Sequence, residues 1–359
     1  MARNSQCSSP QPSEWVKGKV IGSGSFGTVH LAMNKATGAL FVVKSAQSEA
    51  GLQFLENEAN ILENSDSPYV VHCMGRDVLN GANGERKLNL FMEYMCGGSL
   101  ADVAEKFGGA LDEKVIRLYT REILQGLNYL HKNGIVHCDL KCKNVLLGSS
   151  GNIKLADFGC AKRLLNDLKT NGTSTQSCKC IGGTPLWMAP EVLRNEGLDF
   201  AADIWSLGCT IIEMATGRAP WGDEVSNPMA AVLKIACSNE IPEFPTQFSK
   251  EGLDFLTKCL ERNLKSRWTT EELLNHPFVT GKSDDGNSRK EDVCSPASIL
   301  DVGINEGSYE SDESPDGSES ISRIPFSMKC CGERRRLARR QWTDSELASS
   351  ENWVTVRSG

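Results

Sequence analysis

Two short segments near the middle of the chain carry residue types that together suit phosphoryl transfer. They are HCDLKCKN, over residues 137–144, and a DFG tripeptide that begins at Asp157. Asp139 is predicted to accept the proton of a substrate hydroxyl group, and Lys141 to steady the migrating phosphoryl group. The side-chain oxygens of Asn144 and Asp157 suit Mg²⁺, which prefers oxygen ligands. A single loop aspartate is usually a turn or cap residue, so the prediction rests on the order and chemistry of the whole set.

A glycine-rich segment, IGSGSFGTV, is predicted to lie over the phosphates of a nucleotide. The G-x-G-x-x-G-x-V array lets backbone amides approach phosphate oxygens because no side chain intervenes. Glycine turns between strands are common, and dinucleotide-binding turns have similar spacing, but no helical pattern follows here. The residues predicted to contact nucleotide are Ile21, Gly22, Ser23, Gly24, Ser25, Phe26, Gly27 and Val29.

Lys44 ends the apolar run FVVK. A buried ammonium group there is costly unless a carboxylate or an anion receives its charge. Glu58, in the helical stretch NEANIL, is the predicted partner. Such a pair holds the α- and β-phosphates of ATP in phosphotransferases. Taken alone, a lysine at this position is more often a strand-end residue that simply reaches water.

The elements expected around these residues form two groups. The runs WVKGKVIG, GTVHLAM and ALFVVKSA alternate with a period of two and predict an antiparallel meander. Farther along, apolar residues at helical spacing predict a helix that ends at Asn133-Gly134. Those apolar residues are Val115, Ile116, Tyr119, Ile123, Leu127 and Leu130. We therefore predict an α+β fold, with a small antiparallel β lobe carrying one main helix, a larger helical lobe, and a nucleotide cleft between them.

Composition excludes several other classes. Hydrophobic residues make up 40% and charged residues 24% of the 359 residues, which is ordinary for a globular protein. No apolar run approaches the roughly 18 residues of a membrane span, so no span is expected. The net charge of −7 argues against a nucleic-acid-binding body. The 14 cysteines have neither disulfide-framework nor zinc spacing, so reduced thiols and a cytoplasmic or nuclear location are expected.

The chain is predicted to divide into three parts. The motifs lie within residues 15–279, whereas residues 1–14 and 280–359 are polar and predicted to be disordered. The second of these segments is acidic and then basic. Ser295 and Ser314, each followed by proline, are candidate sites for feedback by a proline-directed kinase, although Ser-Pro is frequent in such tails.

The motifs GSGSFGTV, VVK, HCDLKCKN, DFG and APE occur in the order found in eukaryotic protein kinases, and the chain resembles that family. The resemblance implies a bilobal fold with ATP in the cleft. It places Met92 at the back of the adenine pocket, Glu93 to Met95 in the hinge that pairs with adenine, and Leu146 under the ring. It also implies that Asp203 anchors the catalytic loop. Finally, it implies that Arg267 pairs with Glu191 of APE.

Two further motifs narrow the resemblance. Lys141 in DLKCKN and Thr184 in GGTPLWMAPE resemble the serine/threonine class, since tyrosine kinases usually carry DLAARN. GTPLWMAPEV together with WSLGCTIIEMATGRAPW resembles the mitogen-activated protein kinase kinase kinases, particularly short plant members. That resemblance implies ATP and Mg²⁺ as cofactors and MAP kinase kinases as substrates. The alternatives are a pseudokinase scaffold, a serine/threonine kinase outside the cascade and a small-molecule kinase.

Two residues depart from the family pattern. Val42 stands where alanine is usual and is expected to narrow the adenine pocket, where one added methylene is felt. Cys138 replaces the arginine that grips a phosphate on the activation loop, and a thiol cannot make that charge-assisted pair. Phosphorylation of the loop is therefore expected to have a modest effect.

Cysteines gather in and beside the catalytic and activation loops. Nearby lysines would lower the pKa of exposed thiols and make them sensitive to oxidation, whereas burial would leave them inert. The sequence leaves both interpretations open. The cysteines concerned are Cys138, Cys142, Cys160, Cys178 and Cys180.

Overall fold

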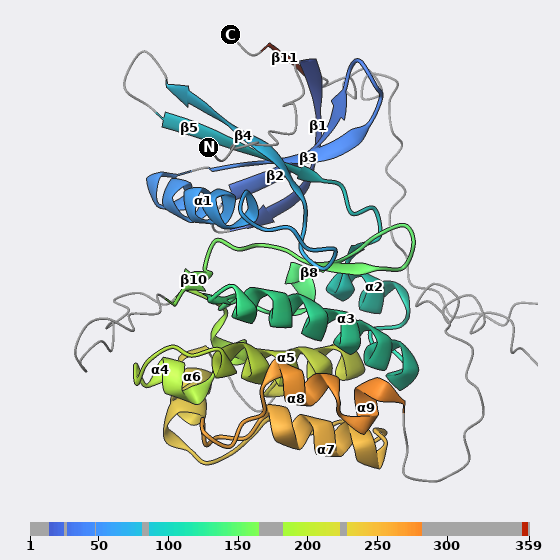
Figure 1. The fold of residues 1–359 in the computed structure, drawn as a ribbon, viewed down its shortest axis with the longest axis vertical. Coiled ribbons are helices and arrows are strands. Elements are labelled where there is room, and N and C mark those ends of the chain that lie inside the picture. Colours follow the sequence, from blue (N-terminus) through green and yellow to red (C-terminus); the bar gives the residue numbers. More distant parts are fainter. Residues whose placement is uncertain are drawn as a thin grey trace, which may run out of the picture.

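The chain folds into a small, mainly β lobe above a larger, mainly helical lobe (Figure 1). The computed structural model describes residues 14–24, 27–46, 48–80, 86–164, 182–222, 228–281 and 354–357. Helix α1 packs against the sheet of the small lobe, and α2 to α9 belong to the large lobe (Figure 1). The predicted bilobal α+β architecture is confirmed.

The small lobe is built on one antiparallel sheet with the strand order β11-β1-β2-β3-β5-β4. Its strands are β1 (Glu14–Gly24), β2 (Gly27–Asn34), β3 (Leu40–Ser45), β4 (Cys73–Asn80), β5 (Arg86–Glu93) and β11 (Val354–Arg357). Because β1, β2 and β3 pair consecutively, the predicted meander is confirmed. Trp15 packs edge-on against Phe41 and Phe91 in a small aromatic core. Side chains alternate along a strand, so Val42 and Lys44 point to the opposite face.

Helix α1 (Glu49–Leu62) begins where the Ser48 side chain accepts a hydrogen bond from the Gly51 amide at 3.1 Å. Such a cap satisfies an amide that has no partner within the helix. Leu55 and Ala59 are fully buried and pack into the main core. The helix contacts β4 and β5, and this contact fixes the position of its polar residues relative to β3.

The large lobe is organised around two long helices, α3 and α5. Its helices are α2 (Leu100–Lys106), α3 (Glu113–Lys132), α4 (Pro190–Leu193), α5 (Ala201–Thr216), α6 (Pro228–Cys237), α7 (Lys250–Cys259), α8 (Thr270–Leu274) and α9 (Pro277–Thr280). All six apolar residues predicted to line α3 are buried. The helix ends at Asn133 and is followed by Gly134 at a positive φ of 69°, as predicted. Helix α5 is buried on almost every side, as expected of a central helix with little polar surface.

Short strands and single turns carry the residues between the lobes. The strands are β6 (Gly98–Ser99), β7 (Ile135–Val136), β8 (Val145–Leu147), β9 (Ile153–Leu155) and β10 (Lys162–Arg163). Strands β6, β8 and β9 form one small sheet, and β7 pairs with β10. The 3-10 turn η1 (Cys142–Asn144) lies in the HCDLKCKN segment, and η2 (Pro185–Trp187) lies in the GTPLWMAPE segment. Among these described helices, none is long and apolar enough to cross a membrane.

Strand β11 departs from the prediction of a tail without regular structure. It pairs antiparallel with β1, with Glu14 opposite Arg357 and Lys17 opposite Val354. The physical reason is visible in the segment VTVR, whose β-branched residues favour strands, and in the open edge of β1 beside it. The other residues of the predicted tail from 282 onward, and residues 1–13, lie outside the described ranges.

Candidate active site

Lys44 makes two ionic contacts, one within the small lobe and one to the DFG segment. Its ammonium nitrogen lies 2.6 Å from Glu58 Oε2 on α1 and 2.8 Å from Asp157 Oδ1 in the DFG segment. The Lys44 side chain is 9% exposed, so it does not reach bulk water as the alternative interpretation required. An active kinase cleft needs both the lysine–glutamate pair and an inward DFG aspartate. This structure has both.

The electrostatics of this group follow from burial and pairing. Burial alone would lower the pKa of Lys44, but the Glu58 and Asp157 carboxylates outweigh it and raise that pKa above its ordinary value. Burial would raise the pKa of Asp157, and the Lys44 ammonium lowers it overall. Both groups therefore stay charged near neutral pH, which suits a lysine that holds phosphates and an aspartate that holds a cation.

Asp139 is held in one orientation by three donors. Thr184 Oγ1 donates to Oδ1 at 2.6 Å, while Lys141 Nζ and Asn144 Nδ2 each donate to Oδ2 at 3.0 Å. Lys141 also donates to the Thr184 hydroxyl. Thr184, in the GGTPLWMAPE segment, thus supports the catalytic loop. Asp139 is thus an oriented carboxylate that can take the proton of an incoming hydroxyl group.

The donor set suits a hard divalent cation. Both hydrogens of the Asn144 amide are used, in bonds to the Asp139 carbonyl at 2.7 Å and to its carboxylate, so Asn144 Oδ1 is directed elsewhere. Asp157 contributes a carboxylate on the facing segment. Among the described residues, no group of three or more His, Cys, Asp or Glu side chains is arranged so that it could hold a metal ion. A cation here would take two protein ligands and complete its shell with phosphate and water, as Mg²⁺ commonly does.

The catalytic loop is anchored from below by Asp203, at the start of α5. Its carboxylate accepts hydrogen bonds from the backbone amides of His137 at 2.8 Å and Cys138 at 3.0 Å, and contacts His131 Nε2 at 2.9 Å. Burial would raise the pKa of Asp203, but the His131 hydrogen bond and the neighbouring histidines lower it. The implied anchoring role is confirmed. Cys138 has a φ of 66°, which is uncommon for a residue other than glycine, so the anchor holds strained backbone next to Asp139.

The glycine-rich segment forms the hairpin of β1 and β2. An added Cβ at Gly27 would lie 2.5 Å from the Ser45 carbonyl oxygen, so packing requires glycine there. At Gly24 an added Cβ would meet nothing within 4 Å, so its backbone faces open space that a phosphate can approach. Ile21 is 41% exposed and Val29 is partly buried against the core. The other predicted residues divide between β1, which holds Gly22 and Ser23, and the undescribed tip, which holds Ser25 and Phe26.

The residues predicted to surround adenine lie at the junction of the lobes. Val42 and Met92 are paired across β3 and β5, and both are buried. Met95 is buried, and Leu146 is partly buried against the core. The Glu93 side chain is engaged elsewhere: it accepts hydrogen bonds from the His72 amide and from Lys154, each at 2.6 Å. Only its backbone is left to face a nucleotide.

The thiols near the catalytic loop are mostly inert. Burial raises the pKa of Cys142 well above its ordinary value and that of Cys160 to about 12. The interpretation that lysines lower these two pKa values is wrong, because burial dominates. Cys138 is partly exposed, and Cys178 and Cys180 lie outside the described residues. Within the described ranges no cysteine forms a disulfide bond.

Two further contacts hold the segment that carries GTPLWMAPE. Arg267 pairs bidentately with Glu191 at 2.7 and 3.1 Å, and the implied pair is confirmed. Glu213 on α5, which no sequence pattern singled out, accepts hydrogen bonds from the Cys142 amide at 2.9 Å and the Trp187 indole at 3.0 Å. The sequence feature that could have indicated Glu213 is its position on the same helix as Asp203. Glu213 thereby ties η2 to the catalytic loop.

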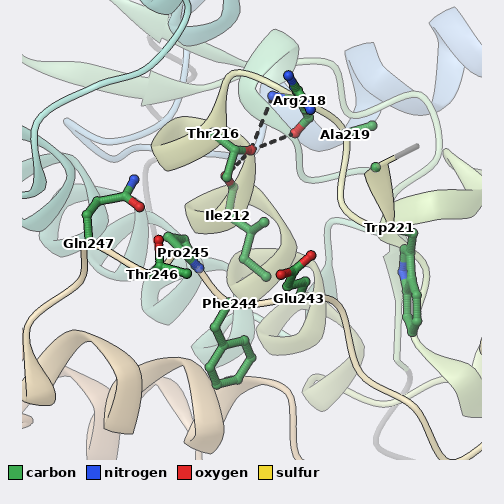
Figure 2. A pocket seen from close by; sticks show the side chains of 11 residues that line it. Ile212, Thr216, Arg218, Ala219, Trp221, Glu243, Phe244, Pro245, Thr246 and Gln247 are labelled. Carbon is green, nitrogen blue, oxygen red and sulfur yellow. Dashed lines mark hydrogen bonds between the residues drawn. The ribbon is translucent and has the colours of Figure 1, made fainter. Parts of the chain in front are cut away.

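A separate pocket of about 610 Å³ lies in the helical lobe (Figure 2). It is bounded by the end of α5, the segment 218–222 and the segment 243–247, with Trp221 and Phe244 among its side chains. None of the predicted catalytic, nucleotide or metal residues lines it. The residues of the chemistry described above therefore lie at the junction of the lobes and not in this pocket.

Comparison with known proteins agrees with this geometry. Residues 15–279 match the protein kinase domain, which is well over half of the chain, so this chain belongs to the protein kinase family. It is an ATP-dependent protein serine/threonine kinase, a class that uses a divalent metal ion.

Its relatives have a common designation. Mitogen-activated protein kinase kinase kinase 17 of Arabidopsis thaliana is 43% identical over 273 residues, covering 76% of this chain and 71% of the relative. Mitogen-activated protein kinase kinase kinase 18 of the same plant is 38% identical over 355 residues, covering 96% and 99%. Mitogen-activated protein kinase kinase kinase 2 is 41% identical, but this chain spans 46% of its length.

Proposed function

We propose that this protein is a MAP kinase kinase kinase that phosphorylates MAP kinase kinases on serine or threonine, with Mg²⁺ as the metal ion that accompanies ATP. The observation that carries the proposal is the similarity over 99% of the length of mitogen-activated protein kinase kinase kinase 18. The contact of Thr184 with Asp139 and Lys141 supports the serine/threonine specificity.

The described residues divide the work of transfer among themselves. ATP supplies the phosphoryl group, and Mg²⁺ supplies charge neutralisation when it is bound. Lys44 orients the phosphates because Glu58 fixes its ammonium group. Asp139 receives the proton of the substrate hydroxyl group, and Lys141 stabilises the developing negative charge. Asn144 and Asp157 are the residues that would hold the metal ion.

The test is a transfer assay with the purified full-length chain, ATP, Mg²⁺ and a panel of catalytically inactive MAP kinase kinases. We expect phosphate on serine or threonine residues of their activation loops, mapped by mass spectrometry. The same chain carrying Asp139→Asn is the matched control, because it removes the base and keeps the shape. Phosphorylation of a general serine/threonine substrate without any MAP kinase kinase would place the enzyme outside the cascade. Absence of all transfer would favour a pseudokinase scaffold.

The location and the tail are part of the same proposal. We expect the protein in the cytoplasm and the nucleus, which imaging of the full-length chain in cells would test. Ser295 and Ser314 lie outside the described residues and remain proposed feedback sites. Mass spectrometry of the protein from stimulated cells should find phosphate on both serines. If both serines are unmodified, the proposed feedback phosphorylation is wrong.

A further inference from the structure

Asn57 on α1 contacts the backbone of the DFG segment in a way that the assigned catalytic roles do not explain. Its amide nitrogen Nδ2 lies 3.2 Å from the Phe158 carbonyl oxygen, 3.0 Å from that of Gly159 and 2.9 Å from that of Ala161. The Ala161 amide donates to the Phe158 carbonyl at 3.1 Å, so the three acceptors belong to one closed turn. A single side chain of α1 thus contacts almost the whole turn after Asp157.

The chemistry of this contact selects a neutral donor. Three carbonyl oxygens converge on Nδ2, which has two hydrogens, so at least one hydrogen is shared. A carboxylate in the same position would place negative charge against three partial negative charges. A residue that only filled space would leave these carbonyls without this donor, at the cost of an unmade hydrogen bond.

The neighbours of Asn57 make the same connection by other means. Glu58, the next residue, accepts a hydrogen bond from the Phe158 amide at 3.4 Å and also forms the ion pair with Lys44. Phe54, one turn earlier on α1, packs against two glycines. A Cβ atom added to Gly159 would lie 3.4 Å from the Phe54 side chain, and one added to Gly182 would lie 3.3 Å from it. Successive residues of a helix point about 100° apart, so α1 faces the lysine with one residue and the DFG turn with the adjacent one.

We propose that Asn57 is a positioning residue that clamps the DFG turn to α1, so that the Lys44–Glu58 pair and the inward position of Asp157 form and break together. The catalytic consequence is indirect. Asn57 touches neither the predicted nucleotide site nor the base, but it holds the segment from which Asp157 presents its carboxylate to the metal ion.

The test compares Asn57→Ala and Asn57→Asp with the same two substitutions at Asn60. Asn60 is an exposed asparagine of the same helix that accepts a hydrogen bond from Arg76 at 2.9 Å and does not face the DFG turn. We expect Asn57→Ala to lower kcat about tenfold and Asn57→Asp about a hundredfold at pH 8, through loss of the donor and then added repulsion. Both Asn60 variants should stay within about twofold of the parent chain.

The pH dependence separates a clamp from simple packing. A protonated carboxyl group can donate one hydrogen bond, so lowering the pH from about 8 to 6 should narrow the gap between Asn57→Asp and Asn57→Ala. Packing alone predicts the opposite order, because aspartate has the shape of asparagine and alanine does not. An Asn57→Asp variant as active as the parent chain would therefore overturn the proposal.

Hydrogen exchange supplies a measurement that does not depend on transfer. The backbone amides of peptides covering residues 158–161 should exchange faster in both Asn57 variants than in the parent chain. In both Asn60 variants their exchange rates should equal those of the parent chain. Unaltered exchange over these residues in Asn57→Ala would refute the clamp, even if Asn57→Asp failed to fold. The activity of the parent chain is measured in the same assay. If the parent chain transfers phosphate and only the Asn57 variants lose activity and protection from exchange, the clamp is tested separately from the proposed reaction.

Discussion

Replacing Asp203 by asparagine tests how much of the activity depends on the anchor beneath the catalytic loop. The change keeps the shape of the side chain and removes its charge. Asp203 accepts from three groups within 3.0 Å: the amides of His137 and Cys138 and the ring of His131. An asparagine keeps one acceptor oxygen, and its amide nitrogen must face at least one of these donors.

The magnitude follows from that mismatch. A hydrogen bond to a charged group contributes about 1.5–3 kcal/mol, and a buried donor left without a partner costs about 1–3 kcal/mol. The Asp203 side chain is 0% exposed, so water does not compensate. We expect a loss of about 3–5 kcal/mol in stability, which lowers the midpoint of thermal unfolding by about 10 °C for a domain of this size. Release of the strained backbone at Cys138 should displace Asp139 and lower kcat by at least about tenfold.

The assay measures kcat, the KM for ATP and the thermal midpoint on purified protein. Asp199→Asn is the matched control: Asp199 is exposed, and the hydrogen bond that its side chain accepts from the Ala201 amide at 3.1 Å survives the change. The KM for ATP should change little, because Lys44 and the hinge lie elsewhere. If kcat of Asp203→Asn stays within twofold of the parent chain, as kcat of Asp199→Asn should, the anchoring role of Asp203 in catalysis is refuted.

The same variant has a defined pH signature. Burial raises the pKa of Asp203, but the hydrogen bond from His131, the charges of His131 and His137 and the His137 amide together outweigh it, so the folded pKa is lowered. Its carboxylate therefore stabilises the fold fully above its unfolded pKa of about 3.9, and that contribution is lost as the pH falls through the folded value. The stability difference between the parent chain and Asp203→Asn should shrink in acid and be constant near neutral pH.

Three further predictions follow from other contacts. Lys44→Ala should lower kcat by at least about a hundredfold in a chain whose circular dichroism spectrum is unchanged; retained turnover would contradict the assigned role. Arg267→Met leaves Glu191 buried without its partner and should cost about 3–5 kcal/mol in urea unfolding, whereas a loss under 1 kcal/mol would show the pair to be dispensable. Iodoacetamide at pH 7.5 should modify exposed Cys96 well before Cys160, whose pKa burial raises to about 12, and equal rates by mass spectrometry would exclude that ordering.

The activation loop gives a prediction that rests on sequence alone, because its phosphorylatable residues lie outside the described ranges. Changing them together to alanine should cost at most about tenfold in kcat, since Cys138 cannot grip a phosphate. A loss of a hundredfold or more, both in this variant and after phosphatase treatment, would show that phosphorylation is the switch. The residues changed are Thr170, Thr173, Ser174, Thr175 and Ser177.

Local patterns were sufficient to predict the elements that carry the chemistry. The apolar spacing of α3 and the glycine after Asn133 specified a helix and its end, because burial and capping are decided within a few residues. A buried strand lysine is costly without a carboxylate, which indicated Glu58 in the helical stretch NEANIL as the partner of Lys44, although Lys44 taken alone could also have reached water. The motif order then placed Asp139 and Asp157 in one cleft.

What the sequence could not show depends on contacts between distant segments. The role of Asn57 requires three carbonyls that lie about a hundred positions away to converge, and asparagine in a helix is otherwise unremarkable. In the sequence Glu213 is a polar residue on a mainly apolar helix. Its role depends on the Cys142 amide and the Trp187 indole, which only the fold brings next to it. Burial of Cys142 and Cys160 is likewise a property of packing, which neighbouring lysines in the sequence do not reveal.

The pairing of β11 with β1 has a consequence for self-association. A free edge strand offers unpaired amides and carbonyls to any other chain, and proteins protect such edges with irregular backbone or with a covering segment. On β1, residues Glu14 to Lys17 pair with β11. Farther along β1, its pairing with β2 shifts register between Lys17 and Val20 and again between Val20 and Gly22, which marks irregular backbone in this strand. The kinase thus covers the start of β1 with a late segment of its own chain, so that the four-residue strand β11 becomes the edge of the sheet. A chain shortened before Val354 would instead present β1 to its neighbours.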